Sequence, residues 1–253
     1  MPDLPPPLPP ETRTVGQLVA ETIRLYGRRF WAGLAVGVGP ALLGFAATQL
    51  DGWTALIVTA SAGAVVLAAT YLLALRVAFA PADAPWGRAA VAAVLVFAPF
   101  ALLVQFLILP GILWLALVVL AVPAVLLERR GVGDGFRRGL ALARADFVHA
   151  LGGLAALWIV VFLTQGVLAF VLRGQADQTL QTAVLLATVV VSPVFFLGAA
   201  LLYDDQAARA VDSPSQTPDH RRGDADLHPA LDADRPGRAD APVESRAAPP
   251  GQP

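Results

Sequence analysis

The chain has 253 residues, and its 57% hydrophobic and 15% charged residues exclude an ordinary soluble domain, which carries about 25% charged residues. It contains neither cysteine nor lysine, which excludes disulfide frameworks, cysteine metal sites, lysine Schiff bases and the phosphate-binding P-loop. The net charge of −1 combines −4 after Tyr203 with +3 before it, and neither part is basic enough to indicate a nucleic-acid partner.

A proline-rich leader and an amphipathic helix open the chain. Residues 1–12 contain the run DLPPPLPP, which favours a disordered or polyproline II segment, with a PxxP ligand as the alternative. The leader lacks the parts of a signal peptide, so we expect no cleavage. Residues 14–29 place apolar side chains near one face, with Thr14 as a candidate N-cap. We expect this helix to lie on the membrane surface, with its arginines facing headgroups or water.

Six apolar segments have about the 20 residues that a helix needs to cross about 30 Å of hydrocarbon. They are 30–50, 53–75, 89–109, 111–127, 147–172 and 180–203. The third and fourth come from one long apolar run, which we divide at the turn signal Pro110-Gly111. We expect the sixth to be kinked or interrupted near Ser192-Pro193. The predicted fold is all-α: a polytopic membrane helical bundle of about six transmembrane helices, over residues 13–203, with amphipathic surface helices.

Glycine and polar residues inside the spans favour contacts between helices. Gly33 and Gly37 form a small-xxx-small pair that would let a neighbouring helix approach closely, although general glycine enrichment of membrane helices is an equal alternative. The polar residues within spans are Gln49, Thr59, Ser61, Thr70, Gln105, Thr164, Gln165 and Ser192. We interpret them as hydrogen-bonding groups between helices, with a substrate path as the alternative. No acid lies deep in a span, which argues against a proton or cation pathway.

An arginine-rich stretch separates the fourth and fifth spans. Its arginines are Arg129, Arg130, Arg137, Arg138 and Arg144. Phe136, Leu140, Ala143 and Phe147 recur three or four residues apart, which predicts a surface helix that begins near Asp134 and dips these side chains into the bilayer. Each arginine near an anionic leaflet is worth about 1 kcal/mol, so the five are candidates for binding lipid headgroups. The alternative is that they only determine topology.

The distribution of arginine also predicts the orientation of the chain. Arginines are frequent before the first span and in the second and fourth loops, and nearly absent from the other loops. By the positive-inside rule, both termini are cytoplasmic. Residues 204–253 are rich in Asp, Arg, Ala and Pro and predict a disordered cytoplasmic tail. The bias towards Ala, Arg, Gly and Pro suggests a bacterium, and hence the bacterial cytoplasmic membrane.

Two stretches carry a resemblance to a known family. They are RTVGQLVAETIRLYGRRFW, from residue 13, and PAVLLERRGVGDGFRRGLALARADF, from residue 123. They resemble uncharacterised bacterial multi-pass proteins grouped around the membrane domain of glycerophosphoryl diester phosphodiesterases. In those proteins a span ends in Glu and a helix leads to an aromatic residue; Glu128, Arg138, Leu142 and Phe147 occupy the matching places. Gly139, where Ser is expected, and Ala145-Asp146, where a basic residue is common, depart from the pattern.

The resemblance covers about residues 13 to 203 and implies a membrane domain. The phosphodiesterase domain itself is absent, so its activity is not implied. Val15-Gly16 and Val132-Gly133 begin similar stretches, which either form a true internal repeat or match by chance.

Catalytic motifs are not evident in the chain, and we expect no cofactor or metal. His149, at the start of the fifth span, could titrate near neutral pH, but a structural polar role is the more common one. The first hypothesis is a non-enzymatic membrane protein that organises lipids or partner proteins through its Arg-rich surface helices. The second is a small transporter or permease subunit, with Pro123, Pro193 and the Gly- and Pro-broken first span along its pathway. An intramembrane enzyme is the least supported, because no acid–base pair lies in the spans.

Overall fold

The computed structural model describes residues 12–212, which form helices and, within that range, no strand. The helices are α1 (Val15–Arg28), α2 (Phe30–Thr48), α3 (Gly52–Phe79), α4 (Trp86–Phe106), α5 (Ile108–Val118), α6 (Ala121–Leu127), α7 (Val132–Ala145), α8 (Phe147–Val171) and α9 (Asp177–Asp212). Six helical segments are long and apolar enough to cross a membrane, with α5 and α6 together forming one of them. The protein is therefore an all-α, multi-pass integral membrane protein, as predicted.

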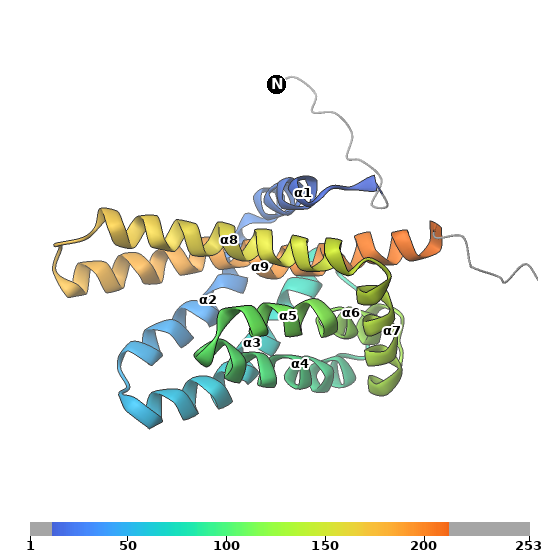
Figure 1. Ribbon diagram of the computed structural model, residues 1–253, viewed down its shortest axis with the longest axis horizontal. Coiled ribbons are helices and arrows are strands. Elements are labelled where there is room, and N and C mark those ends of the chain that lie inside the picture. The colour runs from blue at the N-terminus through green and yellow to red at the C-terminus, as the bar shows by residue number, and fades with distance from the viewer. Residues whose placement is uncertain (1–11, 213–253) are drawn as a thin grey trace, which may run out of the picture. The chain divides into compact units, whose positions relative to one another are not determined.

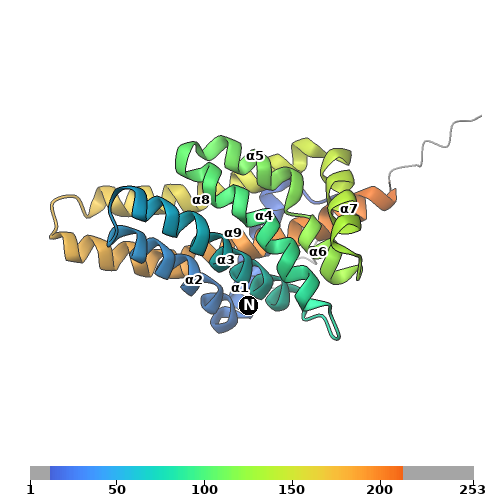
Figure 2. The ribbon, with the colours of Figure 1, turned by 90° about the horizontal axis from the view of Figure 1, so that it is seen from below.

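Successive spans run antiparallel, so that the bundle has two distinct ends. Figures 1 and 2 show the α2–α3, α4–α5 and α8–α9 connections at one end, and α7 with the last turns of α9 at the other. Helix α9 is the longest and packs against α1, α2, α3 and α8, while α3 packs against α4. The bundle is thus arranged around α9.

The outer surface of the bundle is apolar and its interior is aromatic. Trp31 and Trp53 are 80% and 79% exposed near opposite ends of the bundle, as expected for aromatic residues at the two membrane interfaces. Inside, Tyr71 packs edge-on against Phe97, and Phe97 contacts Phe196 of α9, with ring centroids 5.6 and 6.3 Å apart. The large apolar side chains exposed on the outside, such as Trp31 and Trp53, require lipid around the spans.

The fourth span is two short helices, and it begins earlier than predicted. The chain breaks at Leu107, whose backbone is extended, rather than at Pro110-Gly111. Pro110 lies in the first turn of α5, where a proline is tolerated because the N–H groups of a first turn have no intrahelical partner. Pro123 occupies the same place in α6, after a short interruption at residues 119–120. The two prolines therefore start helices instead of turning the chain.

Helix α9 is continuous, so the interruption that was one of the two alternatives near Ser192-Pro193 is wrong, and the other alternative, a kink, stays a prediction. Pro193 lies inside the helix and has no N–H to donate to the carbonyl of Val189. That carbonyl oxygen faces α2, where a Cβ atom added to Gly37 would lie 1.9 Å from it. A Cβ atom on Gly33 would lie 2.3 Å from the Tyr26 ring of α1. The two glycines thus lie where α2 is approached by α9 and α1.

The helical part of the chain extends further than predicted. Residues 204–212 continue α9, so the expectation that they belong to a disordered tail is wrong. Asp205 and Gln206 are 0% and 1% exposed, which ties this extension to the bundle. The predicted disorder of residues 1–11 and 213–253 concerns residues outside the described range.

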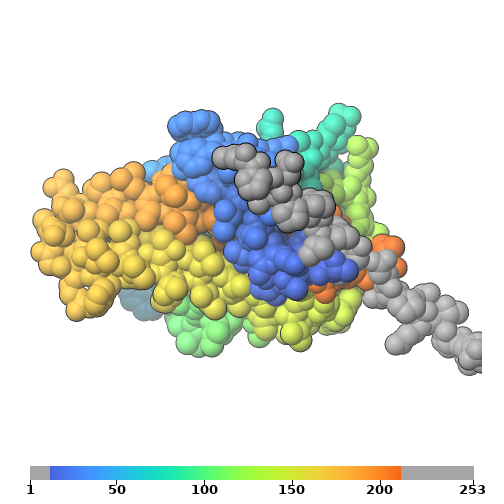
Figure 3. Space-filling view, turned by 90° about the horizontal axis from the view of Figure 1, so that it is seen from above, coloured from blue at the N-terminus to red at the C-terminus, as the bar shows by residue number. Residues whose placement is uncertain are grey.

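Both surface helices pack on the bundle by their apolar faces. Helix α1 lies across α8 and α9 (Figure 3) and buries Leu18 and Thr22 completely. Thr14 caps it as predicted, in a capping box with Gln17. Arg29 is exposed, and it also donates to the carbonyl of Val77 at the end of α3.

Helix α7 lies against α6 and starts at Val132, two residues before the predicted start near Asp134, which lies in its first turn. Its buried residues are Gly135, Gly139, Leu142 and Ala143. A Cβ atom on Gly139 would lie 2.4 Å from the backbone nitrogen of Ala121, so the two helix backbones almost touch. Ala143, predicted to enter the bilayer, is fully buried in the protein instead. The reason is that glycines on α7 allow a closer partner than lipid.

Candidate functional site

Arginines gather at one end of the described bundle, which we call the Arg-rich end. They are Arg13, Arg24, Arg28, Arg29, Arg76, Arg88, Arg129, Arg130, Arg137, Arg138, Arg144 and Arg209. With eight acids in the same region, these twelve arginines give this end a net charge of +4 over residues 12–212. The opposite end has Arg173 against Asp51 and Asp177, a net charge of −1. The fold thus brings together basic residues that are far apart in the sequence.

Two of the five arginines between the fourth and fifth spans form ion pairs inside the protein, with Glu128. Arg130 and Arg138 bind the two carboxylate oxygens of Glu128 through their Nε atoms, at 2.5 and 3.1 Å. Tyr203 of α9 donates its hydroxyl to the same carboxylate. Glu128 therefore connects the end of α6, the helix α7 and the helix α9, and its two arginines are occupied.

Glu128 is held in its charged form. Burial alone would raise the pKa of this carboxyl, but the hydrogen bonds from Tyr203, Arg130 and Arg138 outweigh burial and hold the pKa below its ordinary value. Glu128 is a structural junction, because its three donors come from the loop before α7, from α7 and from α9.

The other three arginines point outwards. Arg129 and Arg144 are exposed, and no ion pair to either occurs among the described residues. Arg137 is 83% exposed, and its one ion pair within residues 12–212 is with Asp134, itself 56% exposed. Its hydrogen bond lowers the pKa of Asp134, but an exposed pair of this kind contributes little to stability. Arg129, Arg137 and Arg144 are the members of the predicted set that remain available to a ligand.

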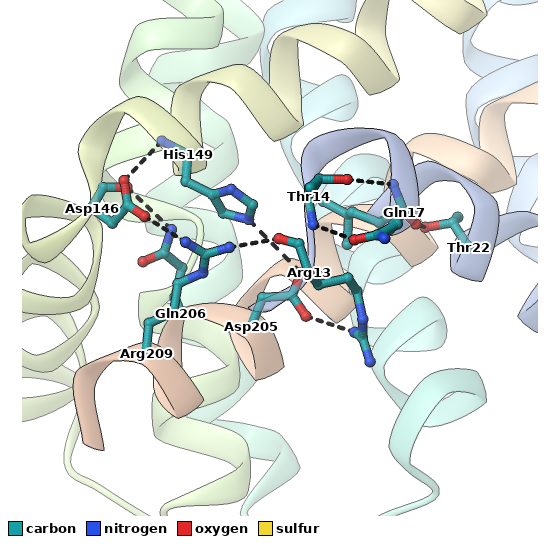
Figure 4. A network of polar contacts seen from close by, with 10 residues as sticks. Arg13, Thr14, Gln17, Thr22, Asp146, His149, Asp205, Gln206 and Arg209 are labelled. Carbon is teal, nitrogen blue, oxygen red and sulfur yellow. Dashed lines mark hydrogen bonds and ion pairs between the residues drawn. The ribbon is translucent and has the colours of Figure 1, made fainter. Parts of the chain in front are cut away.

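A second polar network lies nearby and was not predicted (Figure 4). Arg13 donates to Asp205 at 2.6 Å, and Arg209 donates to Asp146 at 2.9 Å and to the carbonyl of Arg13 at 2.6 Å. The His149 Nε2 atom lies 3.9 Å from the second oxygen of Asp205. These contacts join the segment before α1, the start of α8 and the end of α9.

The Arg13–Asp205 pair of this network is buried and the Arg209–Asp146 pair is partly exposed, and both join separate parts of the fold. The side chains of Arg13 and Asp205 are 9% and 0% exposed. Asp146 accepts from the His149 backbone at 3.1 Å, as an N-cap of α8, and its own carbonyl accepts from Gln206. His149 therefore belongs to a packed polar cluster, in line with the structural role expected for it. Buried charges of this kind are tolerated because they are paired and hydrogen-bonded.

Sequence reasoning missed this network because it ended the last helix too early. The segment that follows Tyr203 reads DDQAARAVD, which has no glycine or proline and three alanines with an arginine among them. These are good helix formers, and they continue the helix without a break. Counting helix formers beyond the apolar run would have found Asp205 and Arg209.

The bundle also contains a partly open cavity of about 320 Å³ towards the end opposite the arginines. Its wall includes Pro40 of α2, Phe100 of α4, Trp158 of α8 and Phe196 of α9. Four polar residues also line it: Thr59, Gln105, Thr188 and Ser192. Three of them were among the polar residues noted in the spans; Thr188, four residues before Ser192 on the same helical face, was missed.

The described residues contain no group of three or more His, Asp or Glu side chains that could hold a metal ion. A scan against protein-family models and searches of curated proteins and of solved structures found no match to this chain. The resemblance to the membrane domain of glycerophosphoryl diester phosphodiesterases therefore stays a prediction.

Proposed function

We propose that this protein is a non-enzymatic membrane protein that gathers anionic phospholipid at its Arg-rich end, in the cytoplasmic leaflet of the bacterial cytoplasmic membrane. The observation that carries the proposal is the sorting of the arginines between α6 and α8. Arg130 and Arg138 are used by Glu128, whereas Arg129, Arg137 and Arg144 are directed outwards. A role in topology alone requires positive charge in this loop. It does not require three of the arginines to be exposed on α7 and just before it.

Physical chemistry supports lipid phosphate as the ligand. Guanidinium groups bind phosphate oxygens through parallel N–H donors, and they are more weakly hydrated than an ammonium group. Helix α7 is fixed to the protein at α6, so its arginines are held at the end of the spans, near the headgroups. Juxtamembrane arginines near an anionic surface contribute about 1 kcal/mol each. A partner protein with an acidic face is the second kind of ligand that this surface suits.

Native mass spectrometry of the full chain, extracted in mild detergent, tests the proposal. We compare wild type with the triple variant Arg129→Gln, Arg137→Gln, Arg144→Gln, and use Arg173→Gln at the opposite end as the matched control. Three arginines at about 1 kcal/mol each predict up to about 100-fold weaker retention of anionic phospholipid in the triple variant. The control should retain lipid as wild type does. Equal retention by all three proteins would refute the proposal and leave the arginines with a topological role.

One observation favours the alternative hypothesis of a small transporter or permease subunit. The cavity is lined by Pro40 and Gly44 of the first span; this span is not broken as expected, since Pro40 lies inside the continuous helix α2, where it removes one backbone hydrogen bond. Irregular or weakened helices in membranes commonly line cavities. The test is solute or lipid flux into liposomes that contain the purified protein. Flux that depends on the protein would establish transport in addition to lipid binding.

A further inference from the structure

We infer that the cavity is a binding site for a neutral single-chain lipid with a hydroxyl-bearing head, such as a monoacylglycerol. The inference does not depend on the proposed function, because the cavity lies away from the Arg-rich end. None of the described residues that line it is charged. Its volume of about 320 Å³ falls at the lower end of the range of about 300–1,000 Å³ found for small-molecule sites.

Two matching bridges of Gln and Thr cross the helix pairs around the cavity. Gln105 of α4 donates to Thr59 of α3 at 2.8 Å, and Gln165 of α8 donates to Thr188 of α9 at 2.9 Å. Each threonine hydroxyl donates its proton to the carbonyl four residues earlier. Each glutamine must therefore donate through its amide nitrogen, which directs its carbonyl oxygen elsewhere. In the second bridge this oxygen, Oε1 of Gln165, is buried and has no hydrogen-bond partner among the described residues.

Ser192 supplies an unpaired hydroxyl on the cavity wall. Thr59, Ser61, Thr164 and Thr188 each donate to the carbonyl four residues earlier, which is the usual local bond of a hydroxyl in a helix. Ser192 does not, and its Oγ atom is buried without a partner among the described residues. The residue is 6% exposed and lines the cavity. A buried hydroxyl in an apolar site is costly unless a polar group meets it, so the wall favours an occupant with a hydrogen-bonding group.

The rest of the wall suits a hydrocarbon chain. Phe100, Trp158, Phe195 and Phe196 contribute aromatic surface, and Trp158 packs edge-on against Phe195 at 5.8 Å between ring centroids. An apolar wall with one buried hydroxyl selects a molecule that is mostly hydrocarbon and has a small neutral polar head. A hydroxyl on that head both donates and accepts hydrogen bonds, whereas a carboxylate or phosphate would be buried without a compensating charge.

The route by which we propose that a lipid chain enters the cavity runs between α2 and α9. A second hollow of about 270 Å³ between α2 and α9 shares Gly44 and Thr188 with the cavity. Several of its other wall residues, among them Phe45 and Gln181, are exposed on the outside of the bundle. A Cβ atom on Gly44 would meet no atom within 4 Å, so this position is open. A chain can therefore pass from the bilayer between α2 and α9, over Gly44, into the cavity.

The test uses the fluorescence of Trp158 in the full-length protein, in nanodiscs of zwitterionic phospholipid. The probe is a monoacylglycerol with a brominated chain, which quenches tryptophan on contact. The signal of interest is the part of the quenching that Trp158→Phe removes. We expect it to saturate at a low probe fraction and to be reversed by unbrominated monoacylglycerol. Quenching that rises linearly with the probe fraction would show random contact in the bilayer and overturn the inference.

Two sets of variants test separately the open space at Gly44 and the hydroxyl of Ser192. Gly44→Phe should remove the saturable quenching, whereas Gly166→Phe, an equally open position on the lipid-exposed side of α8, should keep it. Equal quenching in the two variants would contradict the site.

For the hydroxyl, wild type should prefer monoacylglycerol over a methyl ester of the same chain by about threefold to tenfold, the worth of one hydrogen bond in a membrane. Ser192→Ala should lower that ratio towards one, and an unchanged ratio would overturn the assignment of Ser192. Binding of the ionised fatty acid as tight as that of monoacylglycerol would overturn the neutral class. Thermal unfolding of each variant confirms that the bundle is intact.

Discussion

Single residues of the same type have different roles at the Arg-rich end, and their neighbours decide which. Arg138 is 32% exposed because it reaches back to Glu128, while Arg137, one position earlier, is 83% exposed and points outwards. The sequence predicted the basic stretch but not this division, because the partner that completes the Glu128 site, Tyr203, lies 75 residues away. Local pattern alone cannot show such long-range pairing.

Acidification should release the Glu128 junction. The pKa of Glu128 in the folded protein lies below its ordinary value of about 4.5, so its ionised form stabilises the fold at neutral pH. That stability is fully present above the unfolded pKa and is lost as the pH falls from about 4.5 through the lower folded pKa.

We therefore expect the thermal stability of wild type in detergent to fall over this acidic range by more than that of Glu128→Gln. Glu128→Gln should already be less stable at pH 7. Parallel pH profiles of the two proteins would contradict the role of this carboxylate.

Whole helices show where the predictions from periodicity held and where they failed. The six spans and the helix α1 with its Thr14 cap follow from apolar runs and a capping pattern, and these predictions are confirmed, whereas the position of α1 on the membrane surface stays a prediction. The partner of α7 could not be predicted, because a helix with a narrow apolar face fits either lipid or another helix. Gly135 and Gly139 make α6 the partner, because they let the backbones of α7 and α6 come into contact. The similar helices α1 and α7 thus have different main partners, which are α8 and α9 for α1 and α6 for α7.

The packing of α7 on α6 should be weakened when a side-chain carbon is added at their closest contact, which is at Gly139. A Cβ atom on Gly139 would lie 2.4 Å from the nitrogen and 2.7 Å from the Cα atom of Ala121, both backbone atoms that cannot rotate away. We expect Gly139→Ala to destabilise the protein by about 1–3 kcal/mol, as overpacking does. Gly133→Ala in the same helix meets nothing within 4 Å and should be neutral or stabilising by up to about 1 kcal/mol. Thermal unfolding in detergent compares the two, and equal effects would argue against the contact.

The extension of α9 should depend on its buried ion pair. Asp205→Asn removes the charge that Arg13 binds, and breaking a buried pair commonly costs about 3–5 kcal/mol. Asp204→Asn, at the exposed neighbouring position, is the matched control and should have a small effect.

Limited proteolysis reads out the result. Wild type and the control should resist cleavage between residues 204 and 212, whereas Asp205→Asn should be cut there. Early cleavage of wild type in this segment would show that the tail begins at 204 after all.

At the scale of the whole molecule, the composition and the apolar runs were sufficient for the fold class. Six spans were predictable because the energetic cost of exposing the backbone to lipid leaves few alternatives. The sequence could not predict that four polar residues would meet at one cavity. They come from three helices whose relative rotation depends on packing: Thr59, Gln105, Thr188 and Ser192. The candidate sites are properties of the assembled bundle.

Binding of lipid from the cytoplasmic leaflet requires the Arg-rich end to face the cytoplasm, and the absence of native cysteine makes this orientation directly measurable. Gly133→Cys places one thiol at the exposed start of α7, and Gln175→Cys places one in the exposed α8–α9 loop. A membrane-impermeant maleimide should label Gln175→Cys in intact cells and Gly133→Cys only in inverted vesicles. The reverse pattern would place the arginines on the outside and contradict the proposal that they gather lipid of the cytoplasmic leaflet.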